Sequence, residues 1–183
     1  MSEESGGSVK RNDRLTLVGY RGTGKTSVAK MLSERLGWDS VDADVELERI
    51  ADRTIAEIFA DDGESAFRDL EAQVIADLVK YPKCVIASGG GVVLREENRD
   101  AISESLVVWL TATPRTIGER LVVDSKSATQ RPDLTEQGGL AEIKSVLNER
   151  QSLYESVADT VVPTDGKTPR EIAAEIVKWL ESR

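Results

Sequence analysis

The stretch Gly19–Thr26 reads GYRGTGKT and matches GxxxxGK[ST], the phosphate-binding P-loop. It follows a short apolar run, Leu15–Val18, and precedes a helix-like stretch that runs from Ser27 to Leu36. A strand, a glycine-rich loop and a helix in this order are the context that the motif requires. The alternative is a glycine-rich turn with a lysine at a helix start. We therefore expect a nucleotide-binding site at the carboxyl end of the first strand.

The chemistry of the loop predicts how a nucleotide would be held. Glycines let backbone N–H groups curl around a phosphate, and the helix N-terminus adds donors and a favourable dipole. We expect Lys25 to reach the β- and γ-phosphates of ATP, and the Thr26 hydroxyl to hold Mg²⁺. The residues expected to bind ATP in this segment are Gly22, Thr23, Gly24, Lys25, Thr26 and Ser27.

Composition excludes several classes of function. The 183 residues are 39% hydrophobic and 31% charged, which is typical of one globular enzyme domain. The net charge of −9 argues against general binding of nucleic acid, because affinity for phosphate backbones comes from Lys and Arg. No histidine is present, so Ser–His hydrolysis and histidine–metal chemistry are excluded. The single cysteine, Cys84, permits no intrachain disulfide and is expected to be buried.

The chain shows no signal for a membrane or an export pathway. No stretch approaches the about 20 apolar residues of a transmembrane helix. Residues 1–13 are polar and lack the apolar centre of a signal peptide, so we expect a disordered tail. The expectation is a cytoplasmic monomer that binds neither nucleic acid nor membranes.

Strand-length apolar runs alternate with amphipathic helical stretches, which predicts βαβ units and a parallel sheet covered on both faces. The fold class expected is α/β, a three-layer doubly wound sandwich with a five-stranded parallel sheet. The predicted strands are Leu15–Val18, Trp38–Val41, Cys84–Ala87, Leu106–Leu110 and Thr160–Val162. The predicted helices are Thr26–Leu36, Ala66–Val79, Pro114–Leu121, Leu140–Tyr154 and Pro169–Leu180.

Two segments interrupt the alternation within a single domain, residues 14–183. The segment of about residues 44–77 is helical with two interruptions and is too long for a plain crossover, so we interpret it as a substrate-binding insert. The segment of about residues 121–138 is polar and contains Pro132, which is typical of a mobile lid over the site.

Two aspartates follow the second predicted strand, where ligands bind in open α/β sheets. Alternate residues of an extended segment share a face, so Asp42 and Asp44 could address one site. There they could position Mg²⁺ through water and hold a sugar-like hydroxyl. The alternative is an N-cap aspartate for a helix that begins near Val45. We favour a functional role for Asp44 and leave Asp42 open.

Three glycines and three arginines complete the candidate site. The run Ser88–Gly91 stands where the third strand ends, so its backbone either approaches something closely or turns sharply. Arg68, Arg131 and Arg150 could together bind a small carboxylate and the transferring phosphate. Alone, each arginine would more often be a surface residue.

The chain resembles the shikimate kinase family across roughly Arg14 to Leu180. The order and spacing of several motifs together carry this resemblance, which is far more specific than the P-loop alone. The motifs are Gly19–Thr26, Asp42-Ala43-Asp44, Ile55–Phe59, Asp62–Glu64 with Phe67-Arg68, Gly89–Gly91, Arg131-Pro132, and Arg150 with Leu153-Tyr154.

The resemblance implies a P-loop kinase in which the 3-hydroxyl of shikimate attacks the γ-phosphate of ATP, giving shikimate 3-phosphate and ADP. Asp44 would hold the reacting diol and accept its proton. Arg68 and Arg150 would clamp the carboxylate of shikimate. Lys25, Asp44 and Arg131 would form the catalytic group, and Mg²⁺ would accompany ATP.

The remaining roles are also implied by the resemblance. Gly90, with its neighbours Gly89 and Gly91, would contact the substrate through the backbone. Arg131 would reach the ATP phosphates from the lid, and Lys167 would lie in the loop on the adenine side.

This sequence departs from the family pattern at two places. The lid between Arg120 and Arg131 is a few residues longer than in many members, which puts the match of Arg120 to an adenine-stacking arginine in doubt. Ser88 stands where many relatives carry threonine, and it retains the hydroxyl.

Two other functions fit a P-loop. One is a kinase of the same fold whose acceptor is a phosphate or a neutral sugar. The aspartate pair, the triple glycine and Arg68 argue against it. The other is a GTPase-type switch, which would need a guanine-specificity motif of the Asn-Lys-x-Asp kind, and the sequence contains none.

Overall fold

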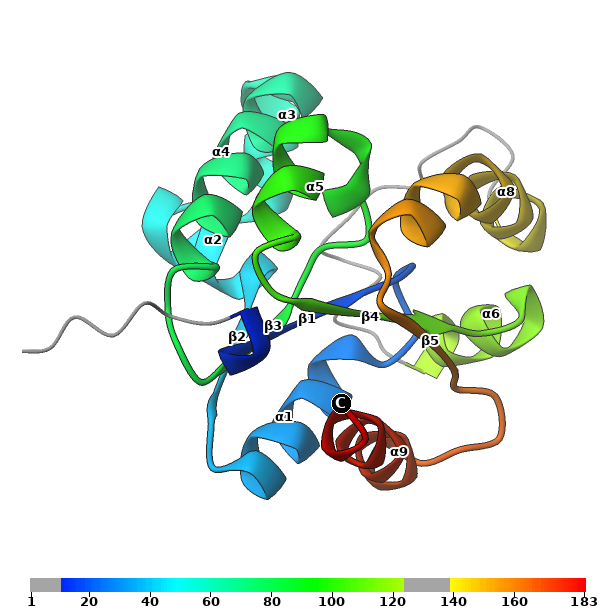
Figure 1. Ribbon diagram of the computed structural model, residues 1–183. Helices are drawn as coiled ribbons and strands as arrows, with labels where there is room; N and C mark the ends of the chain where they lie inside the picture. Colours follow the sequence, from blue (N-terminus) through cyan, green and yellow to red (C-terminus); the bar gives the residue numbers. More distant parts are fainter. Residues whose placement is uncertain (1–10, 124–138) are drawn as a thin grey trace, which may run out of the picture.

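One parallel sheet of five strands runs through the centre of the computed structural model, which describes residues 11–123 and 139–183 (Figure 1). The strand order is β2-β3-β1-β4-β5, and every neighbouring pair is parallel. The strands are Arg14–Val18 (β1), Asp39–Asp42 (β2), Cys84–Ala87 (β3), Leu106–Thr111 (β4) and Thr160–Pro163 (β5). The predicted fold class is therefore confirmed, and the order brings the carboxyl end of β1 between those of β3 and β4.

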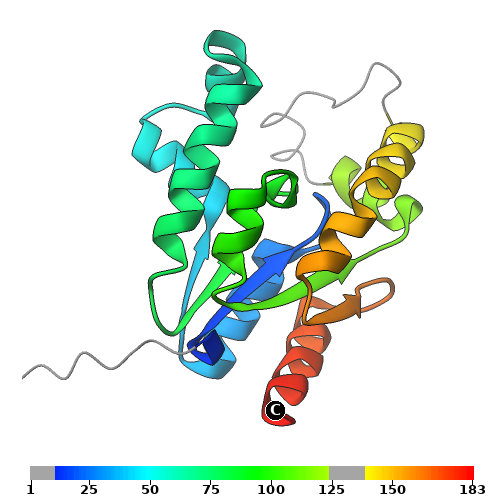
Figure 2. The same cartoon turned by 45° about the horizontal axis from the view of Figure 1, so that its top comes forward.

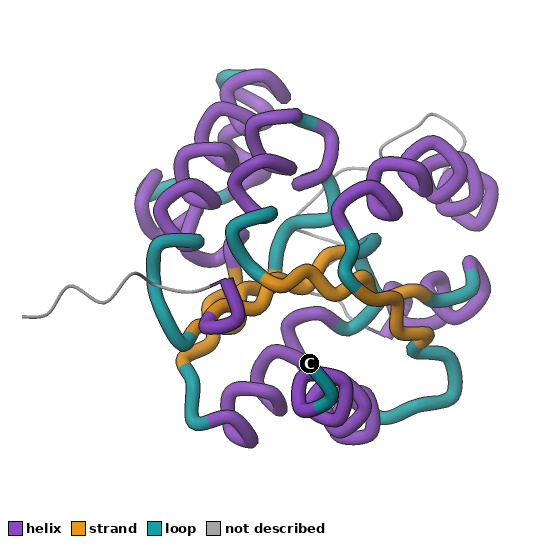
Figure 3. The backbone as a smooth tube through the Cα atoms, viewed as in Figure 1, coloured by secondary structure: helices purple, strands orange, loops and turns teal. Residues whose placement is uncertain are grey.

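Helices cover both faces of the sheet, and the strands form the middle layer (Figure 3). Helices α1 and α9 pack together on one face, and α2 to α5 and α8 lie on the other (Figure 1). The helices are Lys25–Leu36 (α1), Ala43–Ala51 (α2), Ile55–Asp61 (α3), Gly63–Leu78 (α4), Glu96–Ile102 (α5), Pro114–Val123 (α6), Gly139–Val157 (α8) and Pro169–Glu181 (α9). Two short 3₁₀ helices are Arg11–Asp13 (η1) and Val92–Leu94 (η2).

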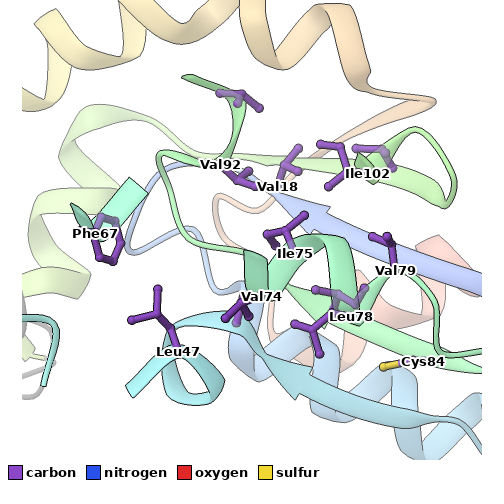
Figure 4. Close-up of a cluster of buried hydrophobic side chains, with 14 of the residues drawn as sticks. Val18, Leu47, Phe67, Val74, Ile75, Leu78, Val79, Cys84, Val92 and Ile102 are labelled. Atoms are coloured by element: carbon purple, nitrogen blue, oxygen red, sulfur yellow. The ribbon is translucent and has the colours of Figure 1, made fainter. Parts of the chain in front are cut away.

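The alternation of side chains along the strands divides the core in two. Successive strand residues point to opposite faces, so Leu15 and Leu17 pack under α1 and α9, whereas Val18 packs on the other side. Figure 4 shows that second cluster, in which Ile75 of α4 lies near Val18 and Phe67 of the same helix lies farther out. The two clusters fix the helices against the sheet.

Local sequence signals explain where several helices begin. Thr54 and Glu57 form a capping box at the start of α3, and Thr168 and Glu171 form another at the start of α9. Each pair satisfies backbone N–H groups that the first helical turn would otherwise leave without partners. Pro169, at the first turn of α9, has the dihedral angle that this position needs.

The structure differs from the sequence-based expectations in the N-terminal segment and in helix α5. Residues 11–13, which the sequence assigns to a disordered tail, form η1. Arg11 makes a bidentate ion pair with Asp159, with distances of 2.9 and 2.8 Å. Helix α5 was not predicted, because its seven residues carry one fully buried apolar side chain, Ile102. Residues 1–10 and 124–138 lie outside the described residues.

The stretch between β2 and β3 folds into three helices, α2 to α4, which form a group on one face of the sheet (Figure 2). Helix α8 lies on the same face, and α5 stands between α8 and that group (Figure 2). Helix α6 packs against α8 through Ile117, Ile143 and Val146. No helix within the described ranges has the length and apolar character that crossing a membrane requires.

Candidate active site

The P-loop joins β1 to α1 with three glycines in backbone conformations that other residues rarely adopt. Gly19, Gly22 and Gly24 have φ values of 141°, 80° and 94°. A side chain at Gly19 would also collide with the carbonyl of Leu110. The loop is closed by Thr23, whose hydroxyl donates to Tyr20 O at 2.8 Å. The backbone can therefore curl over the end of the sheet, as phosphate binding requires.

Lys25 is the first residue of α1 and is buried. Its Nζ donates to the carbonyls of Gly19 at 2.7 Å and Tyr20 at 2.9 Å. Burial of an ammonium group is costly unless its charge and its N–H groups are satisfied. Two carbonyls of the P-loop thus hold the ammonium group of Lys25 against the loop.

Asp42 has two roles in the structure, one for each oxygen. Oδ1 caps α2 by accepting from the backbone N of Asp44 at 3.0 Å and of Val45 at 3.4 Å. Oδ2 accepts from the Thr26 hydroxyl at 2.6 Å. Helix α2 begins at Ala43 rather than near Val45, so Asp44 lies in its first turn and not in an extended segment.

The donor set formed by Thr26 and Asp42 suits magnesium. Mg²⁺ prefers oxygen ligands, keeps several waters, and is usually bound by one or two carboxylates plus substrate phosphates. A hydroxyl and a carboxylate oxygen in direct contact beside the P-loop fit this description. Among the described residues no cluster of three His, Cys, Asp or Glu side chains forms a site of its own.

One cavity of about 420 Å³ opens over the P-loop, a size typical of small-molecule sites. It brings together the predicted nucleotide-binding segment, Asp44 and Gly90, which belong to separate parts of the chain. The predicted site residues that line it are Gly22, Thr23, Gly24, Lys25, Thr26, Ser27, Asp44, Gly90 and Lys167. Arg68, Gly89, Gly91 and Arg150 are not among its lining residues, and Arg131 lies outside the described residues.

The glycine loop after β3 is packed on both sides. A Cβ on Gly90 would lie 3.3 Å from the backbone N of Arg21 in the P-loop. A Cβ on Gly91 would collide with the guanidinium of Arg68, 2.6 Å from Nη2 and 2.7 Å from Cζ. Neither glycine has a positive φ, so close approach and not an unusual backbone conformation is what requires them. The carbonyl of Gly89 accepts a hydrogen bond from the backbone N of Val92 at 3.2 Å, which closes a turn.

The two remaining arginines come from different helices and meet this glycine loop. Arg68 of α4 is buried beside Gly91 and donates to Glu71 at 2.7 Å and to Glu64 at 3.2 Å. Arg150 of α8 donates through Nη1 to the carbonyl of Gly90 at 3.0 Å. Both cations therefore lie against one short loop, which itself lies against the P-loop.

Arg120 and Lys167 also line the cavity. Arg120 donates to Gly22 O at 3.2 Å and to the carbonyl of Thr164 at 2.9 Å, so it ties the P-loop to the turn after β5. Lys167 donates to Glu175 at 2.6 Å. In the same turn, burial alone would raise the pKa of Asp165, but hydrogen bonds from Thr116 and Thr113 lower it. The carboxylate that braces this turn is thus ionised.

Comparison with known proteins points to one family. A family model described as "Shikimate kinase" matches residues 21–181. A shikimate kinase of Rhodopirellula baltica is 42% identical over 165 residues, which cover 90% of this chain and 88% of that protein. The chain belongs to the shikimate kinase family. A second relative, from Thermodesulfovibrio yellowstonii, is 42% identical over 168 residues, 91% of this chain and 94% of that shikimate kinase.

Solved structures agree with this family membership. The shikimate kinase from Acinetobacter baumannii in complex with shikimate superposes with a TM-score of 0.86 at 32% identity, covering 93% of each chain. A gluconokinase from Sinorhizobium meliloti shares only the fold, with a TM-score of 0.57 at 17% identity. The shikimate kinase fold is thus shared with kinases named for other acceptors, so the acceptor site decides the substrate.

Sequence reasoning missed several contacts of this shikimate kinase site. Arg21 forms an ion pair with Glu142 of α8 at 3.1 Å, and the carboxylate is buried. The Tyr154 hydroxyl donates to Gly90 O at 2.5 Å. In the sequence, these contacts are indicated only by an arginine inside the P-loop and by a polar residue at an inward position of a helix. Neither feature shows which residue the side chain contacts.

Proposed function

We propose that this protein transfers the γ-phosphate of ATP to the 3-hydroxyl of shikimate, giving shikimate 3-phosphate and ADP. The observation that carries the proposal is the convergence of Arg68 and Arg150, from two separate helices, on the glycine loop beside the P-loop cavity. Two guanidinium groups form a site for a small carboxylate, because each can donate two parallel hydrogen bonds to it.

The proposed acceptor binds between this carboxylate clamp and Asp44. With its acid group on Arg68 and Arg150, the substrate would direct its hydroxyls toward the cavity that Asp44 lines. Asp44 would then orient the reacting hydroxyl and accept its proton. Phosphoryl transfer proceeds through a loose transition state, so positioning contributes more than a strong base.

The proposed donor binds along the P-loop. Residues Gly22 to Ser27 would hold the phosphates with backbone N–H groups, and Lys25 would move from its carbonyl partners to the β- and γ-phosphates. Thr26 and Asp42 would hold Mg²⁺, which neutralises charge on these phosphates when bound. Arg131 would add a further cation, and Lys167 would contact the adenine side. We infer a cytoplasmic monomer, supplied there with ATP, that binds neither nucleic acid nor membranes.

The test is an ADP-release assay with Mg·ATP, run with and without shikimate, with quinate and gluconate as alternative acceptors. We expect strong release with shikimate alone. The variant Asp44→Asn should lose most of the turnover while retaining binding of shikimate in calorimetry. Release that is stronger with gluconate, or independent of any acceptor, would refute the proposal and leave a kinase of unknown acceptor.

A further inference from the structure

The carbonyl of Gly90 accepts two hydrogen bonds, both from α8. Arg150 Nη1 donates at 3.0 Å, and one helical turn later the Tyr154 hydroxyl donates at 2.5 Å. Tyr154 is fully buried, and its ring stacks on Trp109 of β4 with a centroid separation of 5.4 Å and an interplanar angle of 19°. The strand below therefore fixes the ring, and the ring fixes the hydroxyl.

The position of this carbonyl matters because the glycine loop lies between two arginines. Gly90 contacts Arg150 through its oxygen, and Gly91 lies against the guanidinium of Arg68. Arg68 is itself held by the buried carboxylate of Glu71. A shift of the Gly90 peptide would therefore change the separation of the two guanidinium groups.

The loop has little freedom to shift toward the nucleotide side. The Cα of Gly90 faces the backbone N of Arg21, which a Cβ would approach to 3.3 Å. On its other side the same peptide meets Tyr154 and Arg150. A carbonyl oxygen has two lone pairs, so the two donors can bind it together, one at each.

We propose that Tyr154 is a positioning residue for the acid group of the acceptor. By holding Gly90 O, the Tyr154 hydroxyl orients Arg150 so that its remaining N–H donors face the same point as Arg68. Tyr154 is fully buried and its hydroxyl is bonded to Gly90 O, so it acts through Gly90 and Arg150 and not by touching the substrate. This inference rests on the proposed function, because it specifies how the carboxylate of shikimate is recognised.

The first test is Tyr154→Phe, which keeps the ring and its stacking on Trp109. We expect KM for shikimate to rise about 3- to 10-fold, as for the loss of one buried hydrogen bond, with KM for ATP unchanged. Binding of shikimate measured by calorimetry should weaken by the same factor. Ser105→Ala is the matched control, because it also deletes a buried, hydrogen-bonded hydroxyl but at the amino end of β4. Its KM values should not change.

A second test asks whether the effect passes through the acid group. The methyl ester of shikimate lacks the negative charge that Arg150 and Arg68 would bind. The Tyr154→Phe defect should therefore disappear with the ester, and should add nothing to the defect of Arg150→Met. If Tyr154→Phe fails to fold, Trp109→Phe loosens the tyrosine while keeping its hydroxyl, and a smaller rise in KM for shikimate is expected.

The outcomes separate this inference from the proposed function. Turnover of shikimate by the wild-type enzyme, with an unchanged KM in Tyr154→Phe, overturns the positioning role alone. Equal rises in both KM values, a defect that persists with the ester, or effects that add to those of Arg150→Met also overturn it. A wild-type enzyme that neither binds nor phosphorylates shikimate overturns both.

Discussion

Gly91 offers a sharp test of how the acceptor site is built, through the variant Gly91→Ala. The residue has φ −101° and ψ 6°, a conformation open to alanine, so the substitution introduces no backbone strain. The added Cβ would nevertheless lie 2.6 Å from Nη2 and 2.7 Å from Cζ of Arg68. One methyl group therefore acts directly on the guanidinium that we assign to the carboxylate clamp.

The size of the effect follows from the packing. An ordinary contact at this Cβ is 3.4 Å or longer, so the guanidinium must move by about 1 Å. Arg68 and its partner Glu71 have side chains only 8% and 3% exposed, so the pair has little room to move. Overpacking of this kind costs about 1–3 kcal/mol of stability. For a domain of this size we expect Tm to fall by about 2–12 °C.

The effect on activity should exceed the effect on stability. A displacement of about 1 Å in a positioning group can lower a rate by as much as 100-fold. We expect kcat/KM for shikimate to fall by about 10- to 100-fold, mainly through KM, with KM for ATP nearly unchanged. The assays are steady-state ADP release with each substrate varied, and thermal unfolding without ligands.

Gly118→Ala is the matched control for Gly91→Ala. Gly118 lies inside α6, and an added Cβ would meet the flexible end of the Leu140 side chain at 3.1 Å. A helical glycine gains up to about 1 kcal/mol on replacement by alanine, which offsets this contact. A Gly91→Ala enzyme that matches Gly118→Ala in Tm and in KM for shikimate would refute the packing argument and the assignment of Arg68 to the clamp.

Three further predictions follow from the structure. Lys25→Met should lower kcat for ADP release by about 100-fold or more, because it removes a cation from the transferring phosphate, and a smaller loss would contradict this role. Thr26→Val should raise the Mg²⁺ concentration needed for half-maximal activity, because it removes one of the two proposed protein ligands, Thr26 and Asp42. An unchanged magnesium titration would exclude Thr26 as a ligand. Burial raises the pKa of the Cys84 thiol to about 11. Because the thiolate is the reactive form, a thiol reagent at pH 8 should label Cys84 only after the protein is unfolded in urea. Rapid labelling of the native protein would contradict that burial.

Much of the fold could be predicted because its signals are local. Four of the five strands are short apolar runs between turns, whereas β2 contains one apolar residue, Val41. All five predicted strands lie within one residue of their observed bounds. Helix α5 escaped prediction because a helix of seven residues with one fully buried apolar side chain has no clear periodicity. The order of the strands depends on long-range packing, which the pattern of single segments does not encode.

The sequence predicted which residues gather beside the P-loop better than it predicted their contacts. Residue types alone indicated phosphate, metal and carboxylate binding. The partners of the glycine loop could not be found, because Gly90 and Tyr154 are 64 residues apart in the chain. Likewise, nothing in the sequence told whether Asp42 is a helix cap or a metal ligand. Its two oxygens allow both, since one caps α2 and the other meets Thr26.

A chain with a net charge of −9 nevertheless gathers cations around one site, and the structure explains how they are kept together. Lys25 and Arg150 donate hydrogen bonds to backbone carbonyls, and Arg68 forms an ion pair with the carboxylate of Glu71. These oxygens offset the mutual repulsion of the cations before any ligand arrives. In our proposal, the same contacts let a neutral residue such as Tyr154 influence the recognition of an anion, because its hydroxyl orients the carbonyl that accepts a hydrogen bond from Arg150.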